Sequence, residues 1–529
     1  MPTDCISYQD SGYFTPIIND YLNQKAQLQP LYNRFPTLGN FGAQILEKQL
    51  NYNTENRKIL SQTLLDQYKK VPASDLTLKN IELLQHENTF TITTGHQLNL
   101  FTGPFYFLYK IISTINLAKQ LKAEYPQQHF IPVYWMATED HDFEEINYFS
   151  FKGKKFRWNK ESAGPVGRLS TDGLDEVFKL FSLDLGPGSN AETIKTLFKE
   201  AYLNHNNLAD ATRWLANALF KDFGLVIIEP DDKAFKKLLI PYVKRELLEQ
   251  ISSKMVSETT EKLKDYNIQV NPREINLFYI EDGLRERIIF QDGLYYVNHT
   301  KIKFTEAEIL ETLENHPEKF SPNVIMRPLY QEVILPNLCY IGGGGELAYW
   351  LELKAYFNAV NVTFPILLLR NSVLLVTEKQ AKKADRLLLT WSDLFLKQQE
   401  LVNLKAREIS EFPVDFEKQK KFLRQQFDDL MHIARQTDKS FTGAVEAQQA
   451  KQIKGLENLE KRLLKAQKRK YSKQLERITD LQNELFPNKS LQERQANFAE
   501  FYIESGKNLI EKLQLALQPL ESNFDILVL

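Results

Sequence analysis

Short runs of apolar residues recur along the first 376 residues of the chain, and longer stretches with apolar residues at helical spacing separate them. The β-prone residues 91–94 and the apolar runs at residues 133–137, 223–230, 338–341 and 364–369 predict buried strands. Strands that alternate with helices are typical of a parallel sheet. The pattern therefore predicts an α/β fold with a Rossmann-like core over residues 89–376.

Other parts of the chain have different patterns. Residues 1–88 indicate a mostly helical segment that packs on the core. Residues 148–223 predict an inserted α+β connecting segment, because a polar β-like stretch precedes amphipathic helices. Residues 275–304 alternate like an antiparallel β-meander, with Asp-Gly turns at 282–283 and 292–293.

Beyond the core the composition changes to lysine, arginine, glutamine, glutamate and leucine. Over residues 377–486 we expect long helices, with breaks at Pro413 and at Thr442-Gly443. Apolar residues step by three and four, and a skip before Tyr471 interrupts the heptad as a stutter would. This pattern predicts an antiparallel coiled-coil hairpin. We expect residues 487–529 to return to the core as a helix and a strand, because their apolar end needs a sheet or groove to bury it.

Composition and charge narrow the class of protein. With 43% hydrophobic residues, 25% charged residues and a formal net charge of −2, the chain does not have the profile of a general nucleic-acid binder. The start of the chain lacks the pattern of a signal peptide, and no stretch of about 20 apolar residues predicts a membrane span. Cys5 and Cys339 are too few for a disulfide framework or a cysteine zinc site. We therefore expect a cytoplasmic protein. The helical tail is basic, which a solvated coiled-coil face explains most simply, with a polyanion site as the alternative.

A first candidate site follows the strand at 91–94. Thr93-Thr94-Gly95-His96 fits the T/H-x-G-H pattern of nucleotidyltransferase-type Rossmann folds, in which the histidine contacts ATP phosphates. A loop with glycine then leads into a helix that Pro104 can begin, and a helix N-terminus suits an anion. The alternative is a turn in which His96 only caps the helix. The candidate cofactor-binding residues are Thr94, Gly95, His96, Gln97, Thr102, Gly103 and Lys110.

A second candidate site is the dense group of charges directly after the apolar run at 133–137. Carboxylates with a histidine can bind a metal, act as a general base toward an amine, or hydrogen-bond an amino sugar. The simpler alternative is a helix N-terminus that one or two of these residues cap. Because the group is larger than capping needs, we expect a functional role. The candidate catalytic residues are Glu139, Asp140, His141 and Asp142, and Glu145 is a candidate for substrate binding.

A third candidate site is a run of four glycines after the strand at 338–341. It opens a helix that we expect to extend from Glu346 to about Phe357. Glycines let a ligand approach the backbone closely, and free amides suit a carboxylate or phosphate. Nearby arginines form bidentate contacts with the same groups, although surface salt bridges are the alternative. The candidate substrate-binding residues here are Arg327, Tyr330, Gly342, Gly343, Gly344, Gly345, Glu346, Tyr349, Trp350, Arg370 and Asn371.

Four blocks of the sequence point to a known family. They are TGHQLNLFTGPFYFLYK (94–110), PVYWMATEDHDFEEIN (132–147), RPLYQEVILPNLCYIGGGGELAYW (327–350) and FPILLLRNS (364–372). With these blocks and the basic helical tail, the chain resembles the bacillithiol biosynthesis cysteine ligase family over essentially its whole length. That family usually has glutamine where this chain has His96, so a catalytic imidazole at this position would not be general to the family.

The resemblance implies a ligase that joins the carboxyl of L-cysteine to the amine of glucosaminyl-malate, the final step of bacillithiol synthesis. It implies ATP or ADP as cofactor, with or without Mg²⁺, and no metal held by the protein alone. Such chemistry needs an activated carboxyl and a deprotonated amine. We assign the loop at 95–104 to phosphate or carboxylate recognition and the acidic group at 139–145 to the amino sugar. The glycines at 342–345, with Arg327 or Arg370, would hold the malate carboxylates or a nucleotide phosphate.

Two other functions stay open on the sequence. A nucleotidyltransferase or aminoacyl-tRNA-synthetase-like enzyme is favoured by the T-x-G-H pattern and the basic hairpin, but a K-M-S-K-S-like loop is absent. A non-catalytic dimeric scaffold would leave the acidic group unexplained. We also expect a homodimer through the helical hairpin, because an isolated hairpin would expose its apolar seam. Small molecules are the expected partners, and neither a membrane nor a nucleic acid is expected.

Overall fold

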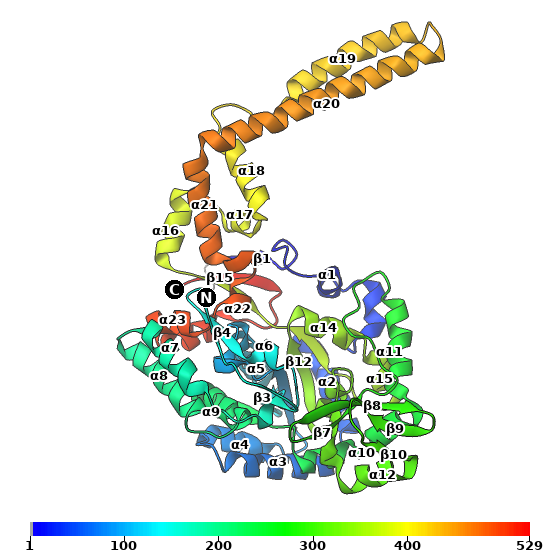
Figure 1. Cartoon of the computed structure of the whole chain (residues 1–529), viewed down its shortest axis with the longest axis vertical. Coiled ribbons are helices and arrows are strands. Elements are labelled where there is room, and N and C mark those ends of the chain that lie inside the picture. The colour runs from blue at the N-terminus through cyan, green and yellow to red at the C-terminus, as the bar shows by residue number, and fades with distance from the viewer. Residues whose placement is uncertain (1–3) are drawn as a thin grey trace. The chain divides into compact units, whose positions relative to one another are not determined.

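The computed structural model describes residues 4–529, which form two compact units (Figure 1). The first unit contains the chain up to Leu375 together with Ser490–Leu529, and the second contains Val376–Lys489. The first unit is α/β and the second is helical. The predicted fold class, a Rossmann-like core with a long helical C-terminal hairpin, is confirmed.

A five-stranded parallel sheet forms the centre of the first unit. Its order is β13-β12-β2-β3-β6, and each pair of neighbours is parallel. The strands are β2 (Thr89–His96), β3 (His129–Met136), β6 (Val226–Ile228), β12 (Asn337–Gly342) and β13 (Ile366–Leu369). The chain leaves β2 toward β3 and β6, whereas β12 and β13 lie on its other side. The strand order therefore reverses between β2 and β12, which is where open α/β sheets bind ligands.

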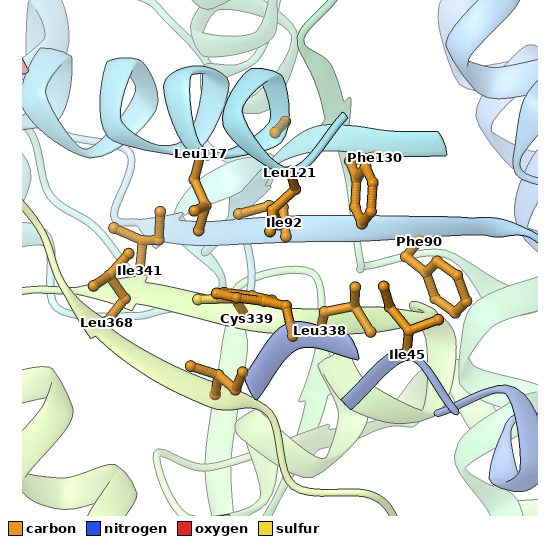
Figure 2. Close-up of a cluster of buried hydrophobic side chains, with 13 residues drawn as sticks. Ile45, Phe90, Ile92, Leu117, Leu121, Phe130, Leu338, Cys339, Ile341 and Leu368 are labelled. Carbon is orange, nitrogen blue, oxygen red and sulfur yellow. The ribbon is translucent and has the colours of Figure 1, made fainter. Parts of the chain in front are cut away.

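One face of this sheet carries a closely packed apolar core. Alternate strand residues point to the same face, and those of β2 and β12 meet helices α5 (Tyr106–Glu124) and α2 (Leu38–Asn51) there. Figure 2 shows Leu117 and Leu121 of α5 beside Ile92, and Ile45 of α2 beside Phe90 and Leu338. This packing fixes the direction in which the carboxyl ends of β2 and β12 present their loops.

The chain between β3 and β6 forms the predicted inserted segment. After the short helix α6 (Phe143–Ile146), it contains β4 (Tyr148–Phe151), β5 (Lys154–Arg157), α7 (Leu174–Leu185), α8 (Ser189–Tyr202) and α9 (Leu208–Phe220). Phe101, from the loop after β2, packs against Phe149, Phe181 and Phe198 with ring centroids 5.2–5.5 Å apart. The insertion is therefore held to the loop that leads from β2 to α5.

The chain between β6 and β12 begins with helices α10 (Lys233–Glu249) and α11 (Ile251–Lys262) and continues with an antiparallel sheet of order β10-β9-β8-β7-β11. The predicted meander is confirmed as β7 (Leu277–Glu281), β8 (Leu284–Gln291), β9 (Leu294–Val297) and β10 (Lys303–Phe304). After α12 (Glu306–Asn315), the chain adds β11 (Phe320–Pro322) and helix α13 (Met326–Ile334) before it enters β12.

The two ends of the described chain meet in a small third sheet of order β1-β15-β14. Its strands are β1 (Asp4–Ser7), β15 (Asn523–Val528) and β14 (Ser372–Val376). The predicted return of the apolar C-terminal end as a strand is thus confirmed, and the otherwise helical N-terminal segment supplies β1 as its partner. The other N-terminal helices are α1 (Pro16–Leu22), α3 (Thr54–Tyr68) and α4 (Asp75–Leu83), and the C-terminal ones are α22 (Gln492–Gln495), α23 (Ala499–Ser505) and α24 (Asn508–Ala516).

One predicted helix of the core is wrong in its extent. Instead of one helix from Glu346 to about Phe357, the structure has α14 (Gly344–Leu351) and α15 (Lys354–Ala359). The helix starts earlier than expected because Gly343 takes the cap position, where its amide donates to the Glu346 side chain at 2.8 Å. The glycine run therefore belongs in part to the first turn of α14.

The second unit contains the predicted hairpin, formed by α19 (Glu417–Ala434) and α20 (Lys439–Lys470), which run side by side (Figure 1). The other helices are α16 (Glu378–Arg386), α17 (Trp391–Phe395), α18 (Gln398–Glu408) and α21 (Ser472–Leu485). Breaks at Pro413 and Tyr471 are confirmed. The break predicted at Thr442-Gly443 is wrong, because Asp438 caps α20 and places that pair inside its first turns. No helix within residues 4–529 is long and apolar enough to cross a membrane.

Candidate active site

A cavity of about 700 Å³ lies at the carboxyl ends of the parallel strands in the first unit. Gly95 and Gln97 reach it from the end of β2, Glu139 and Asp140 from the segment after β3, and the glycines at 343–345 from the start of α14. These three segments flank the point at which the strand order reverses. The cavity is therefore the candidate active site.

Most of the residues predicted from the three sequence motifs meet in this cavity. Those that line it are Gly95, His96, Gln97, Lys110, Glu139, Asp140, His141, Arg327, Tyr330, Gly343, Gly344, Gly345, Glu346, Tyr349 and Arg370. Eight others do not line it. They are Thr94, Thr102, Gly103, Asp142, Glu145, Gly342, Trp350 and Asn371.

The loop residues Thr102 and Gly103 lie away from the cavity because another part of the chain covers them. The Asn497 side chain donates to the backbone carbonyl of Gly103 at 2.7 Å, and the Phe105 amide donates to the Ala496 carbonyl at 2.8 Å. Backbone groups at the start of α5 are thus engaged by the C-terminal segment. This corrects the expectation of an anion at the helix start after Gly103.

Trp350 and Asn371 have structural surroundings instead of a ligand-facing position. Trp350 is fully buried against Tyr340, with ring centroids 4.7 Å apart. Asn371 accepts a hydrogen bond from Ser113 at 2.9 Å and donates to the Gln518 carbonyl at 2.9 Å. Both residues stabilise the core. Their positions in the sequence do not distinguish them from neighbours that face the cavity, such as Tyr349 and Arg370.

Thr94 and Gly342 are occupied by packing within the sheet. The Thr94 hydroxyl donates to the Ile341 carbonyl at 2.8 Å. A Cβ on Gly342 would lie 2.9 Å from the Tyr340 ring, so glycine is needed there for close packing. Asp142 and Glu145 are exposed and lie outside the cavity.

A buried ion pair joins two of the predicted residues. Lys110 Nζ lies 2.5 Å from Glu346 Oε2 and donates to the Gly95 carbonyl at 2.7 Å. Burial lowers the pKa of Lys110, and the Glu346 carboxylate opposes that shift only in part. Burial would raise the pKa of Glu346, but Lys110 and the hydrogen bonds from Tyr340 and Gly343 lower it overall. The pair therefore holds the Gly95 loop against the start of α14.

Arg370 offers an unsatisfied donor to the cavity. The side chain is 4% exposed, Nη2 donates to Glu493 at 2.6 Å, and Nη1 donates to Ser372 at 3.1 Å. Its buried Nε has no hydrogen-bond partner among the described residues. A Cβ on Gly343 would lie 3.8 Å from this nitrogen, so Nε is close to the glycine run. A buried donor without a partner is costly, so this N–H suits a hydrogen-bond acceptor in the cavity.

The acidic group supplies the other side of the cavity. Glu139 pairs with the buried Lys236 at 2.7 Å. Asp140 accepts from the Gln97 side chain at 2.9 Å and from the His141 amide at 2.7 Å. These contacts fix both carboxylates in place. Asp140 keeps free lone pairs, since a carboxylate accepts about four hydrogen bonds.

His141 is a neutral imidazole with one nitrogen already engaged. Its Nδ1 lies 2.6 Å from Arg285 Nη1, and guanidinium groups only donate, so this contact assigns Nδ1 as the acceptor and places the proton on Nε2. Burial and then the Arg285 charge lower the pKa of His141. In this tautomer His141 is a hydrogen-bond donor, which disfavours the predicted role as general base.

His96 is also held neutral. It is 7% exposed, lies between the rings of Tyr106 and Phe107 at 5.5 and 5.0 Å, and its Nε2 has no partner among the described residues. Burial, and then the nearby Lys110 charge, lower the pKa of His96 to about 3. Its ring therefore shapes the cavity wall as an uncharged group.

The sequence motifs missed several cavity residues. They are Tyr106, Arg273, Phe278, Arg285, Arg287 and Arg494, among others. Arg285 stacks on Phe278, with its guanidinium carbon 4.0 Å from the ring centroid. Including these residues, seven arginine and lysine side chains line the cavity against three carboxylates. Because the whole chain has a net charge of −2, positive charge is concentrated at this site, which suits an anionic ligand.

A protein-only metal site is not seen at this position. Within residues 4–529 no group of three histidine, cysteine, aspartate or glutamate side chains is arranged to hold a metal ion. The two carboxylates after β3 are engaged by Lys236 and Gln97.

Comparison with known proteins places the chain in a family. The N-terminal Rossmann-like domain of bacillithiol biosynthesis BshC matches residues 1–371, and the C-terminal coiled-coil domain of BshC matches residues 373–529. The chain belongs to the bacillithiol biosynthesis BshC family. The resemblance inferred from the sequence blocks is thereby confirmed.

Curated relatives of the BshC family cover the whole chain. A Flavobacterium johnsoniae protein named "Putative cysteine ligase BshC" is 67% identical over 529 residues, which is 100% of both chains. Proteins of the same name are 38% identical in Cytophaga hutchinsonii, over 98% of both chains, and 29% identical in a Bacillus cereus strain, over 94% of this chain and 95% of the other. Most residues that line the cavity belong to the part of the chain that matches the Rossmann-like domain.

Proposed function

We propose that this protein is a ligase that joins the carboxyl of L-cysteine to the amine of glucosaminyl-malate, the final step of bacillithiol synthesis. One observation supports this function most: a single cavity combines cationic side chains, one of which has an unsatisfied donor, with fixed carboxylates. Glucosaminyl-malate has two carboxylates on its malate part and an ammonium group on its sugar part, so it needs both kinds of partner. The names of the relatives, cysteine ligases, point the same way.

The malate end would bind where Arg370 and the glycine run meet. The free Nε of Arg370 and the start of α14 provide donors for a carboxylate. Arg327, which lines the same cavity, supplies a second guanidinium. The glycines leave room for the carboxylate, because a side chain at 343 would stand between it and Arg370.

The amino-sugar end would face the acidic side. Asp140 is the carboxylate with free lone pairs, so it would bind the ammonium group and take the proton that must leave before nitrogen attacks. The His141 Nε2–H would donate a hydrogen bond to the carboxyl group that reacts. Glu139 is neutralised by Lys236, and it would orient the segment instead of accepting a proton.

We further propose ATP as the source of carboxyl activation. The excess of cationic side chains in the cavity fits a polyphosphate, and Arg287 of β8 and Arg494 line the cavity without a role toward glucosaminyl-malate. ATP supplies a leaving group on the cysteine carboxyl, and the amide forms when the sugar nitrogen displaces that group. Any Mg²⁺ would come with the nucleotide, since no group of three metal-ligating side chains is arranged to hold it among the described residues.

The protein is also proposed to act in the cytoplasm as a homodimer through its helical hairpin. Several large apolar side chains of α19 and α20 are exposed in the single chain: Phe422, Leu430, Ile433, Phe441 and Leu459, at 45–58%. Exposed apolar side chains of this size on both helices of the hairpin favour burial against a second copy.

A ligation assay tests this function. The full chain is incubated with ATP, L-cysteine and glucosaminyl-malate, and the thiol product is measured by mass. We expect product from the wild type and a decrease in kcat of about 10²–10⁴-fold in Asp140→Asn, the range for loss of a general base. Asp142→Asn is the matched control, because this exposed neighbour lies outside the cavity. Absence of product from the wild type, or equal effects of the two variants, would refute the proposal.

A further inference from the structure

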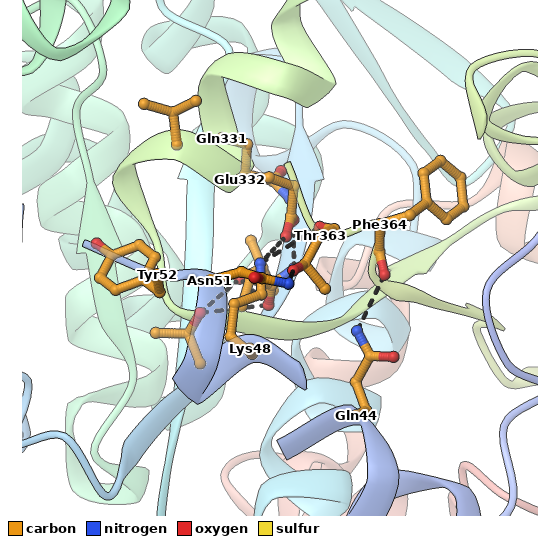
Figure 3. Close-up of polar contacts among 12 residues, drawn as sticks. Gln44, Lys48, Asn51, Tyr52, Gln331, Glu332, Thr363 and Phe364 are labelled. Atoms are coloured by element: carbon orange, nitrogen blue, oxygen red, sulfur yellow. Dashed lines mark hydrogen bonds and ion pairs between the residues drawn. The ribbon is translucent and has the colours of Figure 1, made fainter. Parts of the chain in front are cut away.

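A buried polar network reaches the cavity through α13 and ends at Arg327, and its other members do not line the cavity. Lys48 of α2 and Glu332 of α13 form an ion pair at 3.0 Å, and both side chains are at most 2% exposed. Figure 3 shows this pair beside Gln331. The predicted sequence motif included Gln331 and Glu332, but the proposed ligation gives neither of them a role.

The contacts of Gln331 fix the orientation of its amide. Its Nε2 donates to Glu332 Oε1 at 3.0 Å, and its Oε1 accepts from Arg327 Nη1 at 3.2 Å. A carboxylate only accepts and a guanidinium only donates, so the amide has one favourable direction. If it flipped, an N–H group would face Arg327 and an oxygen would face the Glu332 carboxylate.

Glu332 is itself held from three elements. Besides Lys48, its Oε1 accepts from the Asn337 side chain of β12 at 2.6 Å. The Asn337 oxygen in turn accepts from the Thr93 hydroxyl of β2 at 2.8 Å. The carboxylate is therefore fixed relative to the two strands whose ends form the cavity. A rigid support of this kind lets a ligand-binding side chain keep its geometry without the ligand.

Arg327 is the end of the network that faces the cavity. Its Nη1 contacts Gln331, and its Nη2 donates to the Tyr349 hydroxyl at 3.2 Å. The guanidinium forms no ion pair with a carboxylate among the described residues. Its hydrogen bonds therefore go to two neutral acceptors, with the Tyr340 ring centroid 5.7 Å from the guanidinium carbon, and its charge stays available to an anion.

We infer that Gln331, oriented by the Lys48–Glu332 pair, is a positioning residue that holds Arg327 in the geometry that binds the carboxylates of the substrate. This inference rests on the proposed role of Arg327 toward glucosaminyl-malate. Gln331 acts through Arg327 alone, because its two hydrogen-bonding groups are both used within the network. Its contribution is therefore expected in KM and not in the chemical step.

The variant Gln331→Met keeps the length of the side chain and removes both hydrogen bonds. We expect KM for glucosaminyl-malate to rise about tenfold, which corresponds to one hydrogen bond to a charged group, and kcat to change less than about twofold. In an Arg327→Met background the same change should add nothing, because coupled residues give non-additive effects. Gln44→Met is the control, since Gln44 is a fully buried glutamine of α2 that donates to the Phe364 carbonyl and does not contact Arg327.

A crystal structure of the Gln331→Met variant provides a readout that does not depend on catalysis. The expected result is that Arg327 leaves its position beside Tyr349, whereas it keeps that position in Gln44→Met. An unmoved Arg327, or additive effects of the two substitutions on KM, would overturn the inference. If the wild type lacked ligase activity, the proposed function would fail, but the position of Arg327 would still decide this inference. Should the methionine variant not fold, Gln331→Leu gives the same two readouts.

Discussion

Acidification should destabilise the first unit through His96, a residue whose ring is buried without a partner for Nε2. Burial lowers the pKa of His96 to about 3, whereas an unfolded histidine has a pKa of about 6.5. The folded protein therefore favours the neutral ring. The contribution of the neutral His96 ring to the free energy of unfolding is complete above about pH 6.5 and is lost as the pH falls toward 3.

The size of the effect follows from the two pKa values. A pH of 5 lies about 1.5 units below the unfolded pKa. At this pH the ring is almost fully protonated in the unfolded chain and almost fully neutral in the folded protein. At 1.36 kcal/mol per unit, His96 should cost about 2 kcal/mol of unfolding free energy between pH 7.5 and pH 5.0. His96→Gln removes the titration, so the variant should lose about 2 kcal/mol less than the wild type over this range.

Urea unfolding followed by tryptophan fluorescence measures this difference, because four of the five tryptophans belong to the first unit. His86→Gln is the matched control, since it makes the same replacement at an exposed histidine. The reasoning would be refuted if His96→Gln and His86→Gln had the same pH dependence. Histidine-selective NMR gives a second check: a His96 resonance that titrates near pH 6.5 would show that the ring is hydrated.

Two further predictions concern stability and assembly. Lys48→Met should destabilise the fold by about 3–5 kcal/mol in the same denaturation assay, because it leaves Glu332 as an unpaired buried charge. Adding Glu332→Gln should recover much of the lost unfolding free energy. The control Lys58→Met, which removes an exposed ion pair with Glu55, should have little effect. Sedimentation of the full chain at micromolar concentration should give a species of about twice 61.7 kDa, and a single species at the monomer mass would exclude the homodimer.

The sequence predicted the sheet and the edge at which the cavity lies. The strands β2, β3, β12 and β13 are buried along almost their whole length. In β3, β12 and β13 this appears as a largely apolar run, whereas β2 is rich in threonine and is recognised by its β-prone residues. Polar residues directly after such runs must emerge at the carboxyl edge. This is why Gly95, Asp140 and Gly343 could be recognised from their positions alone.

The errors arise where distant segments decide the surroundings of a residue. The start of α5 has the sequence of an anion site, but Asn497, nearly 400 positions away, donates to the Gly103 carbonyl at its edge. Trp350 and Tyr349 are neighbours in α14, and only the packing of Tyr340 shows that the tryptophan belongs to the core. Local pattern has no information about such contacts.

The missed arginines have a different cause. Arg285 lies in an alternating strand of the meander, and alternation shows that residues 285 and 286 face opposite sides without showing which side meets the cavity. Arg494 lies in the short helix α22, where no periodic signal exists. The positive charge of the cavity therefore became visible only when the meander and the C-terminal segment were placed beside the sheet.

A crystal structure of the full chain with glucosaminyl-malate tests the central claim most directly, because both sides of the cavity are assigned to parts of this molecule. We expect the malate carboxylates within hydrogen-bond distance of Arg370 Nε and the amides at the start of α14, and the amine beside Asp140. Density for the ligand outside this cavity, or with the amine at Arg370 and the carboxylates at Asp140, would contradict the proposed function.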